Sequence, residues 1–301
     1  MPGLELVPLE SAEADEYWKA YVAGRADLPT PNFVAHMERY LRLPPEEQQT
    51  YFAFKENGRV VGTVRIGSSS LTEAPNALGF FSLVPEARSW ARDAILLAAE
   101  PLIANGAPEI QASYDESYSE PFTKVGFQER FSRIRMELSP LAKHEKAELP
   151  LAHPEATDVD DIATFLREAY EGHMEQAFGM HVGSAGQWAD YVTSIWKGES
   201  GTYLPLGSWI TRDAAGALAG ASLASLFMGT PLISELAVRP DARGKGLGRS
   251  LMIATTNALV DLGYERLALY VTIGNDPAIR LYEDLGFRRV GARSVSATLE
   301  L

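Results

Sequence analysis

The residues with the clearest chemical potential form a turn in which glycine recurs at every second position. The turn reads Arg243, Gly244, Lys245, Gly246, Leu247, Gly248 and Arg249. A short apolar stretch typical of a buried strand precedes it, and a helical pattern follows. Glycine lets the backbone pass close to a bulky ligand, and successive free N–H groups at the start of a helix attract phosphate oxygens. The pattern predicts a polyphosphate ligand; the alternative is a glycine-rich turn with no ligand.

The order of residues in this turn differs from two other phosphate-binding motifs, GxxxxGK[ST] and GxGxxG. It reads RxxGxG from Arg243 to Gly248, directly after a strand that ends in Val-Arg-Pro. It resembles the acyl-CoA-binding signature of the GNAT N-acetyltransferase superfamily. The resemblance implies that the loop holds the pyrophosphate of acetyl-CoA and that the preceding strand runs beside the pantetheine arm. The strand residues are Leu236, Ala237 and Val238, and an N–H near Val238 would polarise the thioester carbonyl.

A second segment with a possible catalytic side chain runs from Asn275 to Phe287. Asn275 is expected to cap a helix that stops at Gly286. The segment resembles the second GNAT signature, NxxAxxLYxxxGF. The resemblance implies that Asn275 and Ala278 contact the cofactor and that the Tyr282 hydroxyl protonates the leaving thiolate. A phenol suits this step because it is neutral at pH 7. The alternative for Tyr282 is a tyrosine of the hydrophobic core.

The general base that must deprotonate the acceptor amine is harder to identify. Glu235 precedes the cofactor strand, and its carboxylate could act through a water molecule. A half-exposed glutamate at a strand end, or one in a salt bridge, is the alternative. Some GNAT enzymes carry a base five residues before the Asn, where this chain has Tyr270. Four side chains from a helical region could also reach the mouth of the cleft: Tyr170, Glu171, His173 and His181.

Length, composition and charge narrow the classes of function. The 301 residues suggest two domains, and the 46% apolar content is enough for sizeable cores. Neither a long apolar run nor a signal peptide is evident, which predicts a cytoplasmic protein without a membrane partner. The net charge of −13 argues against nucleic-acid binding and suits a cationic acceptor, either a small-molecule or a peptide amine.

The absence of cysteine restricts the chemistry. Without a thiol there is no cysteine acyl-enzyme, so an acyl group would pass directly to the acceptor or through an oxygen nucleophile. The five histidines lack the HExxH spacing, and no metal site is expected.

The two halves of the chain repeat one pattern. Pro85–Arg88 matches Pro240–Arg243, and Gly126–Phe127 matches Gly286–Phe287, with an offset that drifts from 155 to 160 residues. After the first match, each half has a helical run that ends at a glycine. Together with the GNAT resemblance, the repeat implies an α/β (α+β) fold of two tandem GNAT-like domains. Each would be a mixed, mostly antiparallel central sheet flanked by helices.

The first copy differs from the second where the chemistry would occur. Asp93 aligns with Gly248, and a negative charge at that place would repel a pyrophosphate. Phe122 aligns with Tyr282, so the phenol is missing. The first half is therefore interpreted as a degenerate GNAT-like domain that has lost cofactor binding and catalysis. An unrelated domain is the alternative.

A polar, charged stretch with a proline near each end suits a linker between the two copies. The expected division is a degenerate domain at 1–140, a linker at 141–150 and an acetyl-CoA-binding catalytic domain at 151–301. The predicted function is that of an N-acetyltransferase, which moves an acetyl group from acetyl-CoA directly to a primary amine. The alternative is a non-catalytic acyl-CoA sensor or scaffold.

Overall fold

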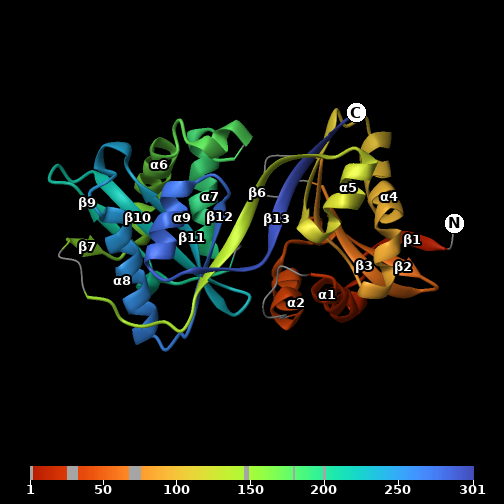
Figure 1. Ribbon diagram of the computed structural model, residues 1–301, viewed down its shortest axis with the longest axis horizontal. Helices are drawn as coiled ribbons and strands as arrows, with labels where there is room; N and C mark the ends of the chain where they lie inside the picture. The colour runs from red at the N-terminus through yellow and green to blue at the C-terminus, as the bar shows by residue number, and fades with distance from the viewer. Residues whose placement is uncertain (1–2, 26–32, 68–75, 146–148, 179, 199–200) are drawn as a thin grey trace. The chain divides into compact units, whose positions relative to one another are not determined.

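The chain separates into two compact units. The computed structural model (Figure 1) describes residues 3–25, 33–67, 76–145, 149–178, 180–198 and 201–301. The first unit comprises the residues up to Ile134 together with Val290–Leu301, and the second comprises Arg135–Arg289. The division expected from the sequence follows chain order, whereas the last strand of the chain lies in the first unit. The boundaries at residues 140 and 151 stay a prediction.

The first unit is built on a mixed sheet. Its strands are β1 (Leu4–Pro8), β2 (Tyr51–Glu56), β3 (Arg59–Ile66), β4 (Ala77–Leu83), β5 (Glu109–Asp115), β6 (Gln128–Leu138) and β13 (Arg288–Glu300). They lie side by side in the order β1, β2, β3, β4, β5, β13, β6. Strands β4 and β5 pair in parallel. The helices are α1 (Ala14–Ala23), α2 (Phe33–Arg42), α3 (Pro45–Gln48), α4 (Ala91–Ala104) and α5 (Ser119–Val125).

The carboxy-terminal strand β13 completes the sheet of the first unit. Its residues 294–300 pair antiparallel with residues 115–109 of β5. The Arg293 guanidinium holds the strand further, because it contacts the carboxylates of Glu116 (2.7 Å) and Glu129 (2.9 Å). The amino-terminal half of the chain by itself therefore lacks one strand of this sheet.

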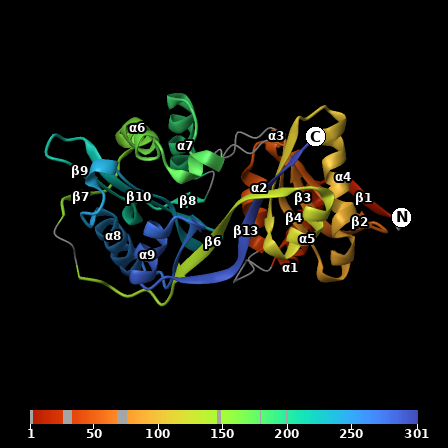
Figure 2. The same cartoon turned by 45° about the horizontal axis from the view of Figure 1, so that its top comes forward.

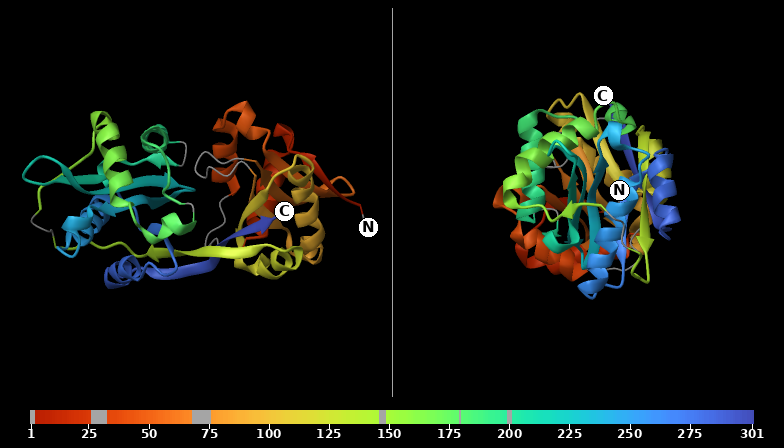
Figure 3. Two further views of the ribbon diagram at one scale, coloured as in Figure 1. Left: turned by 90° about the horizontal axis from the view of Figure 1, so that it is seen from above. Right: turned by 90° about the vertical axis from the view of Figure 1, so that its left-hand side faces the viewer.

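The second unit has a sheet of the same kind. Its own strands are β7 (Leu151–Ala152), β8 (Thr202–Tyr203), β9 (Trp209–Arg212), β10 (Leu218–Phe227), β11 (Thr230–Val238) and β12 (Leu267–Thr272). The order is β6, β12, β11, β10, β9, β7, and β8 pairs with β10. The helices are α6 (Val159–Ala169), α7 (Ala185–Lys197), α8 (Leu247–Asp261) and α9 (Asp276–Asp284). Figure 2 and Figure 3 show α6 and α7 on one face of this sheet and α8 and α9 on the other.

Small residues on β10 let α8 approach the sheet closely. All eight residues from Leu218 to Ser225 are buried. A Cβ atom at Gly220 would lie 2.9 Å from Leu251 of α8, which is closer than side chains pack. Ser222 and Thr255 of α8 share a hydrogen bond of 3.0 Å. This packing fixes the start of α8 relative to the sheet, and with it the glycine-rich turn that precedes the helix.

Among the described residues, each unit has a pair of parallel strands that are bonded near the starts of both strands. In the second unit β11 and β12 pair at Leu232 and Ala268. Further along β11, the register with β10 shifts so that Ser234 is an extra residue, a β-bulge that comes directly before Glu235. The pairing of β11 with β12 does not continue through the described residues that follow the bulge. The backbone of residues 236–238 is therefore left without a partner strand on the β12 side.

The observed architecture confirms a mixed, mostly antiparallel sheet flanked by helices in each unit. No helix in the described part of the chain combines the length and apolar character needed to cross a membrane. Among the same residues, no three His, Asp or Glu side chains gather closely enough to hold a metal ion.

Candidate active site

The glycine-rich turn places an uncapped helix start at the end of β11. Gly246 is the N-cap residue of α8 with φ +81°, and no side chain bonds to the first turn from this position. Gly244 also has a positive φ, +74°, and a Cβ atom at either glycine would meet no other atom within 4 Å. Because the first amides of a helix have no intrahelical partner, they can donate to an anion. This cradle fits the pyrophosphate of coenzyme A.

Two cations of the turn, Arg243 and Lys245, are held by backbone oxygens. Arg243 Nε donates to the Val238 carbonyl (3.0 Å), and its Nη2 donates to the Ala169 carbonyl at the end of α6 (2.6 Å). Lys245 Nζ donates to the Asp241 carbonyl (3.0 Å). The Arg243 side chain thus ties the turn to β11 and to α6, and the anion-binding capacity rests on the backbone amides of the turn. The cofactor contacts expected for residues 236–238, 243–249, Asn275 and Ala278 stay predictions.

Glu235 is a buried carboxylate held by two phenols. It is 4% exposed, so the alternative of a half-exposed glutamate at a strand end is wrong. The Tyr170 hydroxyl donates to Oε2 (2.7 Å), and the Tyr191 hydroxyl donates to Oε1 (2.5 Å). Burial, followed by the negative charge of Glu235, raises the pKa of Tyr170 well above its usual value. Tyr170 therefore stays a neutral phenol at physiological pH and keeps its proton for the hydrogen bond to Glu235.

Tyr282 lies on α9 in the second signature. Its side chain is buried and packs against Phe287, with ring centroids 5.8 Å apart. The Asn275 side chain accepts a hydrogen bond from the Ala278 N–H (3.4 Å), which confirms that Asn275 caps this helix. Gly248 of α8 faces the same helix, because a Cβ atom there would lie 3.4 Å from Leu281. The two signatures are thus adjacent in the fold, while the catalytic role of Tyr282 stays a prediction.

The remaining base candidates lie in three different surroundings. Glu171 is exposed. The Tyr170 ring, whose hydroxyl donates to Glu235, stacks on the His181 ring, with ring centroids 3.8 Å apart and an angle of 7°. His173 Nε2 lies 3.5 Å from Asn275 Nδ2, and burial lowers the pKa of His173.

One buried carboxylate, Glu175, was not among the residues predicted from the sequence. It is 6% exposed, and its Oε2 lies 2.9 Å from His181 Nε2. The Thr272 hydroxyl, at the end of β12, donates to its Oε1. A glutamate between two histidines could have suggested a polar cluster, but residues 174–178 form a short 3-10 turn whose burial no periodic pattern reveals.

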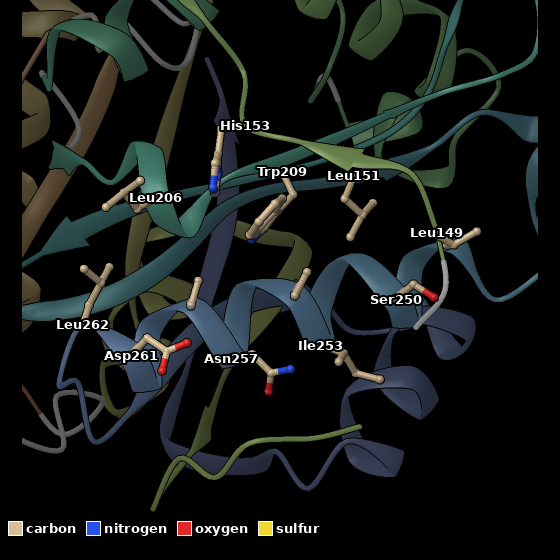
Figure 4. Close-up of a pocket in the computed structure, with 12 residues that line it drawn as sticks. Leu149, Leu151, His153, Leu206, Trp209, Ser250, Ile253, Asn257, Asp261 and Leu262 are labelled. Carbon is tan, nitrogen blue, oxygen red and sulfur yellow. The ribbon is translucent and has the colours of Figure 1, made fainter. Parts of the chain in front are cut away.

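A separate cavity of about 440 Å³ lies along α8. Figure 4 shows its walls, which come from α8 on one side and from the segments around Leu151, Leu206 and Trp209 on the other. None of its lining residues belongs to the predicted site. The cavity is therefore distinct from the turn and from Glu235.

The first unit has different side chains at the corresponding places. The offset of 155 residues that pairs Pro85 with Pro240 also pairs Phe80 with Glu235. Phe80 packs among aromatic rings, 5.7 Å from Trp18 and 5.5 Å from Tyr21. An aromatic cluster therefore fills the place of the carboxylate.

In the first unit, the end of the β4 backbone forms hydrogen bonds with a side chain of the same unit, Tyr118. The Leu83 N–H donates to Tyr118 Oη (2.9 Å), and the Tyr118 hydroxyl donates to the Leu83 carbonyl (3.1 Å). By the same offset Leu83 corresponds to Val238. The Leu83 N–H thus already has a hydrogen-bond partner in Tyr118, whereas the resemblance expects the N–H near Val238 to bind the thioester carbonyl.

Comparison with known proteins defines the class. Residues 166–287 match the acetyltransferase (GNAT) family. A tandem GNAT protein from the clavulanic acid biosynthesis pathway superposes with a TM-score of 0.70 at 19% identity, covering 99% of this chain and 98% of that one. A GCN5-related N-acetyltransferase from Sphaerobacter thermophilus gives a TM-score of 0.75 at 14% identity, covering 99% and 95%. Residues 166–287 therefore match the GNAT family, and the whole chain has the tandem GNAT fold, as its signatures and repeat predicted.

The curated relatives with similar sequences are mycothiol acetyltransferases. That of Clavibacter sepedonicus is 32% identical over 133 residues, which are 44% of this chain and 40% of the relative. That of Propionibacterium freudenreichii subsp. shermanii is 29% identical over 180 residues, 55% of this chain and 53% of the relative. The matched region thus spans about two fifths to one half of these relatives.

Proposed function

We propose that the protein is an N-acetyltransferase that moves an acetyl group from acetyl-CoA directly to a primary amine. The observation that carries the proposal is Glu235, a buried carboxylate with two phenol donors on the strand that leads into the RxxGxG turn. A buried, oriented carboxylate next to an anion cradle is the arrangement that deprotonation of a bound ammonium requires.

In this proposal the second unit holds acetyl-CoA. The amides of residues 244–249 bind the pyrophosphate, and the backbone edge of Leu236, Ala237 and Val238 that faces away from β10 runs beside the pantetheine arm. Asn275 and Ala278 contact the arm from the start of α9. Negative charge on the pyrophosphate is stabilised by the positive end of the α8 dipole.

The transfer needs one base and one acid. Glu235 accepts a proton from the acceptor ammonium, directly or through water, and the free amine attacks the thioester carbonyl. The N–H near Val238 stabilises the negative charge that develops on the carbonyl oxygen. When the C–S bond breaks, Tyr282 donates its proton to the thiolate, and the surplus proton of the attacking nitrogen restores the phenol. The products are an amide and free coenzyme A, and Glu235 releases its proton to water. The chain has no cysteine, so no thioester to the protein is formed.

The acceptor is proposed to be a small-molecule or peptide amine. The curated relatives are named for mycothiol, so a mycothiol-related amine is the first acceptor to test. The net charge of −13 favours the approach of a cationic amine.

The proposal predicts thiol release from acetyl-CoA in the presence of an amine panel that begins with mycothiol-related amines. Glu235→Gln removes the base, and Tyr282→Phe removes the acid. We expect each to lower kcat by about a hundredfold, since general acid or base catalysis contributes at least that much. Calorimetric binding of acetyl-CoA should be retained in both variants.

The exposed Glu168→Gln, on α6, is the matched control for loss of one negative charge. Tight acetyl-CoA binding without turnover of any amine would favour the alternative function, a non-catalytic sensor or scaffold. Wild-type turnover in Glu235→Gln would refute the assignment of the base.

A further inference from the structure

Glu175 is a buried carboxylate that the proposed reaction does not use. Its Oε1 accepts the Thr272 hydroxyl, and its Oε2 lies 2.9 Å from His181 Nε2 and 3.5 Å from His173 Nδ1. A carboxylate removed from water is costly unless its oxygens have partners. These contacts therefore fix the place of Glu175 and of the groups bonded to it.

His181 connects Glu175 to the candidate base. The His181 ring lies parallel to the Tyr170 ring at 3.8 Å, and the Tyr170 hydroxyl donates to Glu235 Oε2 (2.7 Å). Trp188 lies nearly parallel to both rings, 5.9 Å from each centroid. Of these stacked rings, His181 thus contacts Glu175 and Tyr170 is hydrogen-bonded to Glu235.

The same carboxylate joins the acceptor side of the unit to the second cofactor signature. Thr272 is the last residue of β12 and stands three residues before Asn275. Met174, next to Glu175, packs at this place, since a Cβ atom at Gly274 would lie 3.1 Å from its Cε. Glu175 therefore anchors the segment that carries His181 to a strand whose end leads into α9.

We propose that Glu175 is a positioning residue of the acceptor site: its carboxylate holds the His181 ring against Tyr170 and so fixes the phenol that donates to Glu235. This inference rests on the proposed function, in which Glu235 is the base. Without the carboxylate, the His181 ring loses its hydrogen-bond partner, and the phenol is no longer confined to the position in which it donates to Glu235. Catalysis is sensitive to such displacements because the reacting groups must stay within a fraction of an ångström of the productive geometry.

The test compares Glu175→Ala with Glu175→Gln, whose amide oxygen can still accept from His181. Glu175→Ala should lower kcat by about tenfold, while the KM for acetyl-CoA stays within about twofold, because the effect is on geometry at the base. Glu175→Gln should restore kcat to within about threefold of wild type. Thr272→Val, which removes one anchor at nearly constant volume, should lower kcat in the same direction.

Two further measurements separate positioning from a general structural effect. In a Glu235→Gln background, Glu175→Ala should add little to the loss, since both substitutions act on one base. The fluorescence emission of Trp188, obtained as the difference from chains carrying Trp188→Phe, should change in Glu175→Ala without any substrate, because the neighbouring His181 ring is released. Glu168→Gln should leave both signals unchanged.

The outcomes distinguish this inference from the proposed function. Unchanged Trp188 emission in Glu175→Ala, or a loss of kcat that is fully multiplicative with Glu235→Gln, would overturn the role of Glu175. Wild-type turnover in Glu235→Gln alone would instead overturn Glu235 as the base, while the Trp188 signal would still show whether Glu175 holds the stack.

Discussion

At the scale of single residues, the two units differ in chemistry at one corresponding position. The residue that follows the bulge of β11 is Glu235, with two phenol donors. Its counterpart in the first unit is Phe80, which adopts a positive φ of 51° and packs among aromatic rings. A phenylalanine cannot accept a proton, so the first unit lacks a base at this place whatever it binds.

His36 gives the first unit a predictable dependence on pH. Burial, followed by the charges of Arg25 and Arg39, lowers the pKa of His36 to about 3. The unfolded chain takes up this proton below about pH 6.5 and the folded chain does not, so folding stability falls as the pH drops from about 6.5 toward 3, by about 1.4 kcal/mol per pH unit from this group. His36→Phe keeps an aromatic ring stacked on Trp18 but has no group that takes up a proton. The part of the pH dependence of folding stability that comes from His36 should therefore disappear in this variant.

Urea unfolding at several pH values between 7 and 4 measures the effect. The control is His144→Phe, because His144 bonds to Asn257 through its backbone groups. A stability curve of His36→Phe as steep as that of the wild type would contradict the assignment.

At the scale of elements, the proposed function assigns the pyrophosphate to the start of α8. Gly248→Asp would introduce the residue that the first unit has at Asp93. We expect acetyl-CoA affinity to fall at least about tenfold, because a negative charge in the first turn of α8 would repel the pyrophosphate. Folding stability should hold or rise by about 0.3–1 kcal/mol, since an acidic residue in the first turn favours the helix dipole.

Gly248→Ala separates charge from bulk. Its Cβ atom would make an ordinary contact of 3.4 Å with Leu281, so binding should fall much less than with aspartate. Isothermal titration with acetyl-CoA and thermal unfolding of the same samples give both quantities. Equal losses of affinity in the two variants would mean that the close packing of α8 on α9, and not charge, governs the site.

At the scale of the whole molecule, the two units are expected to differ in cofactor capacity. Tyr118 satisfies the Leu83 N–H, and Arg88 Nη2 donates to the Gly24 carbonyl at the end of α1 (2.8 Å). We therefore predict that the full chain binds one acetyl-CoA, in the second unit. The full chain is the proper sample, because β13 is part of the first unit's sheet.

Titration calorimetry with acetyl-CoA measures this stoichiometry, and Gly248→Asp assigns the site. Two molecules per chain, or one molecule that still binds tightly to Gly248→Asp, would contradict the interpretation of the first unit as degenerate.

Local signals were sufficient to predict much of this protein. The RxxGxG turn, the Asn275 cap and the repeat with its offset of 155 to 160 residues predicted two GNAT-like copies and a helix that starts at the glycine-rich turn. The anion site at this helix start stays a prediction. These features are short-range: a glycine conformation, a helix cap and the amides of one helical turn depend on neighbours in the chain.

The tertiary structure decided the surroundings of the candidate base and the spatial limits of the units. Glu235 reads as an ordinary strand-end glutamate until Tyr170 and Tyr191 are brought to its two oxygens from 65 and 44 residues away. Glu175 becomes a structural anchor only through Thr272, 97 residues further on. The last strand joins the first unit by pairing with β5. Such contacts depend on how sheets and helices pack, and no spacing within the sequence encodes them.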